Sequence, residues 1–372
     1  MNRSKILTSF ISPSINTNQS LILFKNILRK EIPNEGILTR EFEKIISKVL
    51  EVKYVTATTS GTIAIFLALK ALKIGYNDEV IIPNLTFAAT ANAVKLAGAK
   101  PILVDINEQN LLIDTNKIKK KINKKTKAII AVHVSGRGSN ILKLKKISKK
   151  YKINLIEDAA EAFYSKYKNK PLGSFGEIGC FSFSPPKIFT TGQGGAIVTN
   201  NLKLHKEIVK LKNQGRVGKT DGGEDTFDSI GYNFKFTNLQ SALGISQLKN
   251  LNWRKKKLIE NHNFYKKNIK ENSNFKIFSF NLKNGELPLW TDIYCKKRNK
   301  LFNFLIKRGI ECRYFWHPIN YCKPYKQSFN NLEVSRKLHG KLMWLPSSLK
   351  LKRNELVKVC KLINEFNKKY NG

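Results

Sequence analysis

The chain has 372 residues, of which 41% are hydrophobic and 10% aromatic, and its formal net charge is +40. This length and apolar content indicate a globular protein with one large and one smaller domain, and exclude a disordered chain. The charge points first to nucleic acid, but the lysines are scattered beside Asn and Ile and far outnumber the arginines, the preferred readers of phosphate and base edges, so we expect no nucleic-acid partner.

The first 35 residues give weak signals, and we expect an arm that packs on the rest. Short apolar runs then alternate with amphipathic stretches as far as Asp158. The predicted strands are Tyr54–Ala57, Glu79–Ile82, Pro101–Val104, Ala128–Val134 and Asn154–Ile156. The predicted helices are Thr62–Leu72, Thr86–Leu96, Thr115–Ile122 and Ile141–Lys149. Strands and helices in this order predict an α/β fold with a mostly parallel sheet covered on both faces.

Two strand-like runs, Ile178–Phe183 and Ala196–Thr199, follow on either side of Lys187, and a helix begins near Lys203. A long helical pattern from Leu239 to Leu251 is expected to leave the large domain. Beyond it we expect a strand at Phe275–Phe278 and helices at Lys297–Arg308 and Asn354–Phe366. The predicted domains are therefore residues 1–250, with the arm, and residues 251–372.

The five cysteines form no C-x-x-C pair and are odd in number. This usage is typical of a reduced cytoplasmic compartment, with no disulfide framework and no metal site. The N-terminus lacks the apolar run and cleavage site of a signal peptide. No apolar run reaches transmembrane length, so we expect no membrane insertion.

Lys187 and Asp158 are the first candidates for chemistry. Lys187 lies among prolines, glycines and apolar residues, in a setting where burial would free its amine to attack a carbonyl. The competing interpretation is a plain surface lysine. Asp158 ends an apolar strand, where a crevice opens in such sheets, and its carboxylate could keep a pyridine nitrogen protonated. The competing interpretation is a helix N-cap.

Three further features surround these two. Thr58–Thr62 follows a strand and opens a helix, which can form a phosphate site or simply an N-cap. Phe87 follows the next strand and could stack on a flat cofactor or belong to the core. Glu161 lies one helical turn beyond Asp158 and could face the same space. The order of these features together favours an enzyme that uses pyridoxal phosphate (PLP).

These segments resemble the DegT/DnrJ/EryC1/StrS family of nucleotide-sugar aminotransferases, which are PLP enzymes of fold type I. The resemblance runs through nearly the whole chain. It implies a large domain with a mostly parallel seven-stranded sheet between helices and a smaller C-terminal α/β domain. The similar segments are Gly36–Glu43, Ser60–Thr62, Thr86–Asn92, Asp105, His133–Gly136, Glu157–Ala160, Gly173–Gly176, Phe181–Phe183 with Lys187, Gly192–Gly195, Gly231–Thr237 with Leu239 and Gln240, and Trp316–Pro318.

The resemblance also implies roles for the site residues. Lys187 would carry the cofactor covalently, Asp158 would pair with the pyridine nitrogen, and Phe87 would stack on the ring. The cofactor phosphate would be held by Gly61, Thr62 and Ser182.

Two further residues follow from the resemblance. Asn233 would reach the phosphate from the neighbouring subunit, which implies a homodimer with shared active sites. Family members often have Gln at the position of Glu161, in contact with the phenolic oxygen of the cofactor. An ionised Glu would face a phenolate there, so Glu161 is either protonated or turned away.

The amino donor implied by the resemblance is L-glutamate and the acceptor is a nucleotide-linked keto sugar. Arg313 can bind a diphosphate with its forked guanidinium. Trp316 and Tyr321 offer flat faces and His317 a hydrogen-bonding ring, although each could also be structural. The segment around them resembles GDP-perosamine-type 4-aminotransferases, which favours a 4-keto-6-deoxyhexose. Members that use UDP- and dTDP-sugars have related segments, so the nucleotide stays open.

Three alternatives are weighed against this interpretation. A PLP-dependent sugar dehydratase shares the fold but typically has His at the position of Lys187. A regulatory relative would be expected to lack Lys187 or Asp158, and both are present. The interpretation as a nucleic-acid-binding protein is supported by the net charge alone.

Overall fold

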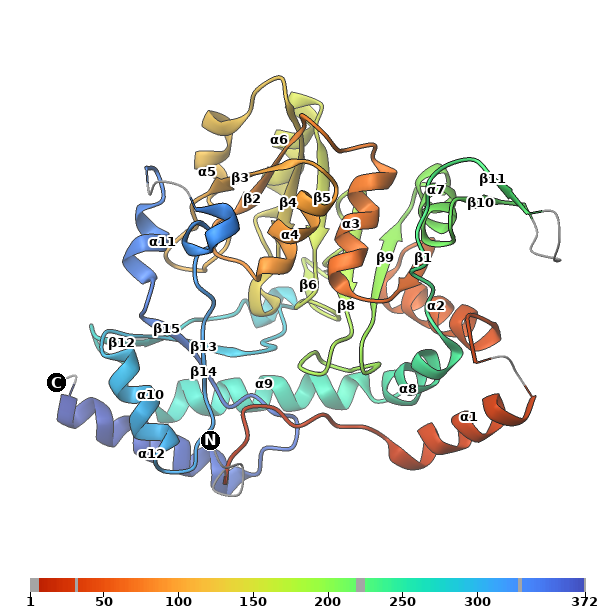
Figure 1. Ribbon diagram of the computed structural model, residues 1–372. Helices are drawn as coiled ribbons and strands as arrows, with labels where there is room; N and C mark the ends of the chain where they lie inside the picture. The colour runs from red at the N-terminus through yellow and green to blue at the C-terminus, as the bar shows by residue number, and fades with distance from the viewer. Residues whose placement is uncertain (1–6, 31–32, 219–224, 327–329, 371–372) are drawn as a thin grey trace.

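The computed structural model describes residues 7–30, 33–218, 225–326 and 330–370. Figure 1 shows a large sheet with its helices in the upper part of the view, and a smaller sheet below it. Within the described residues, no helix combines the length and the apolar character needed to cross a membrane.

The large sheet has seven strands in the order β1-β9-β8-β5-β4-β2-β3. Strand β9 pairs antiparallel with both of its neighbours, and the other four pairs of adjacent strands are parallel. The predicted α/β class with a mostly parallel seven-stranded sheet is therefore confirmed. The strands are β1 (Tyr54–Thr58), β2 (Glu79–Pro83), β3 (Lys100–Val104), β4 (Thr126–Val132), β5 (Asn154–Asp158), β8 (Ile178–Ser182) and β9 (Gly195–Thr199).

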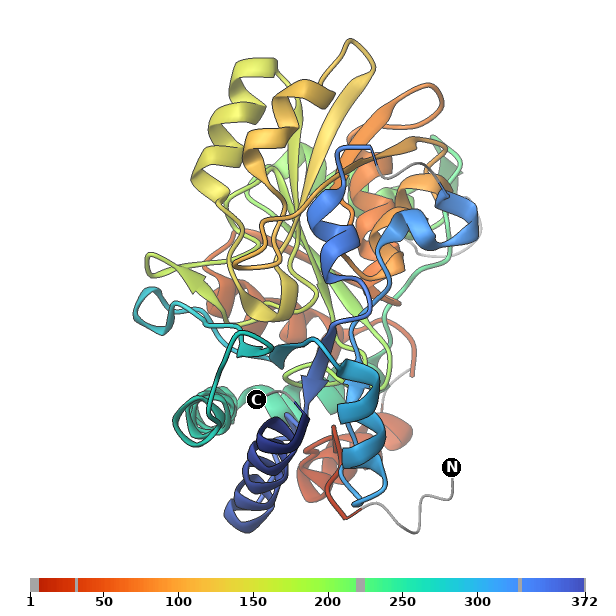
Figure 2. The same ribbon diagram turned by 90° about the vertical axis from the view of Figure 1, so that its left-hand side faces the viewer.

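Helices cover both faces of this sheet, which explains why its strands are apolar runs with no alternation. Helices α3 (Gly61–Ala71) and α4 (Ala88–Leu96) lie on one face, and α5 (Thr115–Ile118) and α6 (Ile141–Tyr151) lie on the other (Figure 2). Helix α7 (Leu202–Lys212) packs on α3, β1 and β9.

Several predicted boundaries are wrong. The backbone of Phe87 is extended (φ −65°, ψ 142°), so α4 begins at Ala88 and not at Thr86. The helix predicted at Thr115–Ile122 is α5 followed by a 3-10 turn, Lys119–Lys121. Strand β4 ends at Val132 because a 3-10 turn, Val134–Gly136, follows it.

The helical pattern predicted from Leu239 to Leu251 covers α8 (Asn238–Leu248) and only the first residue of a second helix, α9 (Leu251–Asn268), which was not predicted. The helix breaks because the backbone of Asn250 (φ −106°, ψ 20°) leaves the helical region. The apolar pattern continues across this break, so periodicity alone predicts one helix.

The N-terminal region contains a helix that the sequence did not predict, α1 (Thr17–Lys30), which packs on α8. Ile27 of α1 is buried, and the Ser20 hydroxyl lies 2.9 Å from that of Ser246 on α8. Leu21 and Ile22 are exposed, which blurs the amphipathic pattern. Helix α2 (Ile37–Leu50) follows and packs on β1 and α8.

The smaller sheet is antiparallel, with the order β12-β13-β15-β14. A second hydrophobic core, formed by residues between 265 and 366, lies around it. This core supports the proposed division near residue 250, which we retain as a proposal. The elements are β12 (Phe275–Ile277), β13 (Thr291–Cys295), β14 (Arg313–Tyr314), β15 (Leu342–Leu345), α10 (Arg298–Ile306) and α12 (Arg353–Tyr370).

One segment between these strands returns to the large sheet. Helix α11 (Glu333–Leu338) begins beside β3, where the amides of Val334 and Ser335 donate hydrogen bonds to Asp105 at 2.9 Å. The remaining short elements are β6 (Lys166–Tyr167) with β7 (Lys170–Pro171), β10 (Arg216–Val217) with β11 (Thr226–Phe227), and the 3-10 turns Leu282–Asn284, Ile319–Tyr321 and Lys323–Tyr325.

Candidate active site

A cavity of about 270 Å³ opens at the carboxyl ends of the parallel strands. The residues that follow β1, β2, β4 and β8 line it, together with the end of β5, which is where ligands bind in α/β sheets. Eight of the predicted site residues line this cavity: Gly61, Thr62, Phe87, Asp158, Glu161, Ser182, Lys187 and Trp316.

The first turn of α3 forms one wall. The amide groups of a helix's first turn have no partner within the helix and attract anions. Ser60 caps the helix by accepting a hydrogen bond from the amide of Ile63 at 3.2 Å. A Cβ atom on Gly61 would lie 2.8 Å from Cβ of Ser182, so only glycine allows α3 and β8 to approach this closely. The N-cap interpretation is therefore confirmed, and the phosphate-site interpretation stays a prediction.

Asp158 ends β5 and is buried, with 5% of its surface exposed. Its carboxylate accepts hydrogen bonds from Thr90 Oγ1 at 2.7 Å and from the amide of Ala160 at 3.2 Å. Burial raises its pKa, and the hydrogen bond from Thr90 only partly offsets this effect. A protonated ring nitrogen in the cavity would supply the missing positive charge, so this carboxylate fits a pyridine cofactor.

Lys187 faces the cavity and is no surface lysine, since only 13% of its side chain is exposed. Its Nζ donates a hydrogen bond to Glu161 Oε1 at 3.3 Å. The carboxylate of Glu161 also accepts hydrogen bonds from the indole of Trp290 at 3.1 Å and the amide of Ser135 at 2.9 Å. Glu161 is therefore not turned away, which corrects one of the two predicted alternatives.

Phe87 is not a core aromatic. It is 58% exposed and lines the cavity, with its ring centroid 6.0 Å from that of Trp316. An aromatic face left open at a cavity wall can stack on a flat ligand.

A buried pair supports the floor of the cavity. The amide of Ser139 donates to His133 Nδ1 at 3.1 Å, so the other ring nitrogen of His133 donates to Glu157 at 2.9 Å. Glu157 also accepts three backbone amides from the Gly173–Gly176 turn. Burial raises the pKa of Glu157, but the hydrogen bonds outweigh it and hold the pKa below its usual range.

Four predicted residues do not line this cavity. Asn233 is exposed and forms a backbone bridge with Asn213. The guanidinium of Arg313, on edge strand β14, lies 4.8 Å from the Phe10 ring centroid. The remaining two, His317 and Tyr321, both contact His339.

Sequence reasoning also missed residues that the structure brings to the site. Thr90 and His133 lie inside the segments that resemble the family. Thr90 is one turn after Phe87, and His133 directly follows β4, and these positions could have indicated them. Gln193 lines the cavity from the glycine turn after Lys187. Trp290 lies over a hundred residues from Glu161, and no local pattern indicated it.

The DegT/DnrJ/EryC1/StrS aminotransferase family matches residues 15–364. The chain is 34% identical over 338 residues to the GDP-perosamine synthase of Escherichia coli O157:H7, a match that covers 90% of this chain and 92% of that protein.

Two further proteins are similar over most of their length. One is the UDP-4-amino-4,6-dideoxy-N-acetyl-beta-L-altrosamine transaminase of Campylobacter jejuni serotype O:23/36, with 36% identity over 318 residues, 82% of this chain and 83% of that protein. The other is Helicobacter pylori PseC, a solved aminotransferase involved in the biosynthesis of pseudoaminic acid. It aligns with a TM-score of 0.91 at 27% identity and covers 98% of this chain and 100% of that chain.

Proposed function

Because the chain belongs to the DegT/DnrJ/EryC1/StrS aminotransferase family, we propose that it moves an amino group from an amino acid to the keto carbon of a nucleotide-linked sugar. The chain is an aminotransferase, and its cofactor is pyridoxal phosphate. The observation that carries the proposal is a single cavity lined by the Lys187 amine, the buried Asp158 carboxylate and the first turn of α3.

These groups fit the cofactor. When bound, PLP supplies an electron sink that allows an amino group to be transferred. We propose that the amides of Gly61 and Thr62 and the hydroxyl of Ser182 bind its phosphate, and that Phe87 packs on its ring. Asp158 binds the ring nitrogen and keeps it protonated, and the resulting positive charge favours the ionised carboxylate.

Lys187 moves the proton in this proposal. Its Nζ removes a proton from the α-carbon of the amino donor and later delivers one to the sugar carbon that receives the amino group. Glu161, 3.3 Å away, holds the amine in place while it carries the extra proton. The keto acid leaves before the sugar binds, so we expect ping-pong kinetics.

We propose L-glutamate as the donor and a 4-keto-6-deoxyhexose as the acceptor, for the biosynthesis of a surface polysaccharide or another glycan. The name of the C. jejuni relative describes a 4-amino-4,6-dideoxy sugar, and that of the E. coli relative a GDP-sugar. Both names support a nucleotide-linked acceptor. The odd number of cysteines, with no C-x-x-C pair, supports a cytoplasmic location.

The proposed sugar-binding residues fall into two groups. Trp316 lines the cavity beside Phe87 and offers a face to the sugar ring. Arg313, His317 and Tyr321 lie outside the lining of the cavity. As proposed ligands they would meet the outer, nucleotide-bearing part of the substrate, with Arg313 on the diphosphate.

We also propose a homodimer with shared active sites. Asn233 is exposed and does not line the cavity of its own chain. We propose that this exposed side-chain amide binds the cofactor phosphate in the site of a second copy. Light scattering would measure the mass, and Asn233→Ala should weaken cofactor binding in the dimer.

Cofactor absorbance and product formation test the function. The protein with PLP should show a band near the visible edge, and with L-glutamate and a panel of nucleotide keto sugars it should release 2-oxoglutarate. Lys187→Ala should abolish the band and lower turnover by roughly 10²- to 10⁴-fold. The control is Lys256→Ala, since the Lys256 side chain is 78% exposed. A band and turnover that survive in Lys187→Ala would contradict the proposal.

A further inference from the structure

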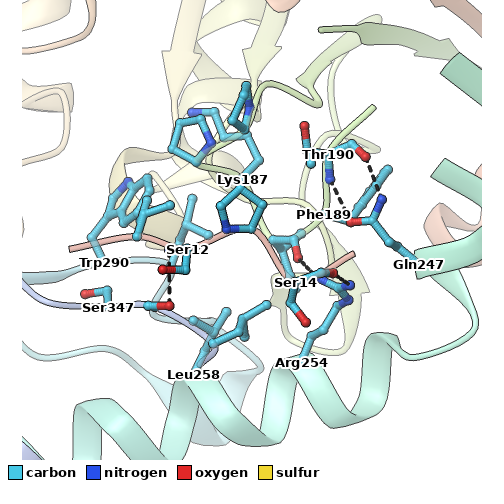
Figure 3. A pocket seen from close by; sticks show the side chains of 18 residues that line it. Ser12, Ser14, Lys187, Phe189, Thr190, Gln247, Arg254, Leu258, Trp290 and Ser347 are labelled. Atoms are coloured by element: carbon cyan, nitrogen blue, oxygen red, sulfur yellow. Dashed lines mark hydrogen bonds between the residues drawn. The ribbon is translucent and has the colours of Figure 1, made fainter. Parts of the chain in front are cut away.

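The N-terminal arm and the loop that carries Lys187 meet at a second, small cavity. This cavity of about 20 Å³ is lined by arm residues 11–14, loop residues 185–190, helix α9 and residues 347–349 (Figure 3). Lys187 lines both this cavity and the larger one described above. The arm therefore reaches the back of the candidate active site.

Arg254 of α9 joins the two segments. Its Nη1 donates a hydrogen bond to the carbonyl of Ile188 at 2.7 Å, and its Nη2 donates to the carbonyl of Ser14. Figure 3 shows Arg254 rising from α9 toward Ser14. Because Ile188 directly follows Lys187, this bond fixes the peptide next to the catalytic side chain.

Burying the charge of Arg254 in this position is expected to destabilise the fold. The residue is only 3% exposed, and no carboxylate among the described residues forms an ion pair with it. Burial lowers its pKa to about 10. A buried charge without a counter-ion destabilises a fold unless it is well hydrogen-bonded, and an apolar residue of similar volume would avoid this cost. The two carbonyl contacts are what the guanidinium provides and an apolar residue cannot.

A second contact links the arm to the same lysine. The ring of Phe10 stacks on Trp290, with centroids 5.2 Å apart and an angle of 22° between the planes. The indole of Trp290 donates to Glu161, which pairs with Lys187. The arm thus contacts the surroundings of Lys187 from two sides.

We propose that Arg254 is a positioning residue that couples the docked N-terminal arm to the Lys187 loop. The arm and the loop share one guanidinium, so a displaced arm releases the peptide that follows Lys187 and changes the position of its amine. This inference rests on the proposed role of Lys187.

The test compares Arg254→Met and Arg254→Lys with the control Arg353→Met. Arg353 is an exposed arginine at the start of α12 whose guanidinium lies over the Phe264 ring. Two readouts are measured in the full chain: chymotrypsin cleavage after Phe10, followed by mass spectrometry, and the pH midpoint of the cofactor absorbance band.

Arg254→Met should speed cleavage after Phe10 by at least about 10-fold, because two hydrogen bonds to a charged group are lost. It should also shift the pH midpoint of the absorbance band. Arg254→Lys should give a cleavage rate and a pH midpoint between those of Arg254→Met and the unaltered protein. One ammonium group cannot reproduce the forked guanidinium that binds two carbonyls. The control should match the unaltered protein in both measurements.

Two outcomes would overturn the inference. The first is that Arg254→Met and the control show the same rate of cleavage after Phe10 and the same pH midpoint of the cofactor absorbance band. The second is faster cleavage throughout the chain with an unchanged midpoint, which would assign Arg254 a purely structural role. Failure of the proposed function is distinct, because it appears as a band that persists in Lys187→Ala.

Discussion

Glu161 brings a carboxylate to the wall of the cavity where the Lys187 amine also lies. Its three hydrogen-bond donors come from separate parts of the chain: Lys187, Trp290 and the amide of Ser135. The backbone of Ser135 is left-handed (φ 55°), and its hydroxyl donates to Asp292 at 2.8 Å. A carboxylate held by this many donors is fixed in orientation.

Glu161→Gln tests how this carboxylate acts on the lysine. The amide keeps the shape of the side chain but cannot be ionised, so this variant tests whether a negative charge at residue 161 acts on the nitrogen carried by Lys187, 3.3 Å away. We expect the pH midpoint of the cofactor absorbance band to fall by about one pH unit. A spectrophotometric pH titration measures this midpoint.

A matched control comes from Glu177, whose carboxylate accepts a hydrogen bond from the amide of Leu155 but does not line the cavity. Glu177→Gln should leave the midpoint unchanged. If Glu161→Gln behaves in the same way, Glu161 does not influence the charge at Lys187.

The close packing of α3 against β8 depends on contacts between residues of different elements. A Cβ atom at residue 61 would lie 2.8 Å from Cβ of Ser182, and one at residue 195 would lie 2.5 Å from the carbonyl of Ser60. The glycines therefore allow three segments to pack closely, and this packing brings the first turn of α3 to the cavity. The same residues that indicate a phosphate site in the sequence are needed for this packing.

Gly61→Ala should therefore destabilise the protein, although Gly→Ala within a helix usually stabilises it by roughly 0.5–1 kcal/mol. We expect a loss of about 1–3 kcal/mol in the free energy of unfolding, because the extra methyl overpacks the junction. Denaturant unfolding of the cofactor-free protein measures this change.

Ser182→Gly in the same chain removes the atom that clashes. The double variant should recover most of the loss, which a double-mutant cycle detects as coupling between the two positions. If the changes in the free energy of unfolding of the two single variants simply add in the double variant, the Ser182 side chain does not limit the space at Gly61.

At the scale of the whole molecule, Asp105 ties the returning segment of the C-terminal part to the large sheet. Its carboxylate accepts hydrogen bonds from the amides of Val334 and Ser335, the Ser335 hydroxyl at 2.6 Å and Lys117 at 3.0 Å. Burial raises the pKa of Asp105, but the bonds from Ser335 and Lys117 outweigh it and leave the pKa below its usual range.

Because the pKa of Asp105 is lowered in the folded protein, the sign of the change in stability with pH can be predicted. A carboxyl with a lowered pKa in the folded state stabilises the protein fully above its unfolded pKa of about 4. The stabilisation is lost as the pH falls through the lower, folded value. Asp105→Asn should therefore cost about 2 kcal/mol at pH 7, and the difference from the unaltered protein should narrow below about pH 4.

Urea unfolding at pH 7, pH 5 and pH 3 measures this difference. The control is Glu333→Gln, since Glu333 also pairs with Lys117 but its side chain is 58% exposed. Exposed pairs contribute little. A constant difference between the Asp105→Asn variant and the unaltered protein at all three pH values would contradict the assignment.

The sequence by itself determined the seven strands, their α/β order and half of the candidate site. Strands buried on both faces are continuous apolar runs, so they can be recognised locally. Gly61, Phe87, Asp158 and Ser182 lie at or just after the ends of such strands, and a parallel sheet brings those ends to one edge. The start of α4 at Ala88 and the break before α9 at Asn250 were missed because they depend on backbone angles that composition does not fix.

The tertiary structure alone decided what surrounds these residues. Trp290 reaches Glu161, and Arg254 reaches Ile188, from positions far along the chain. It also decided that Arg313 lies outside the cavity lining and that Glu161 faces Lys187. The physical reason is that local patterns record which side of an element is buried, whereas contacts between distant segments depend on how those buried sides pack together.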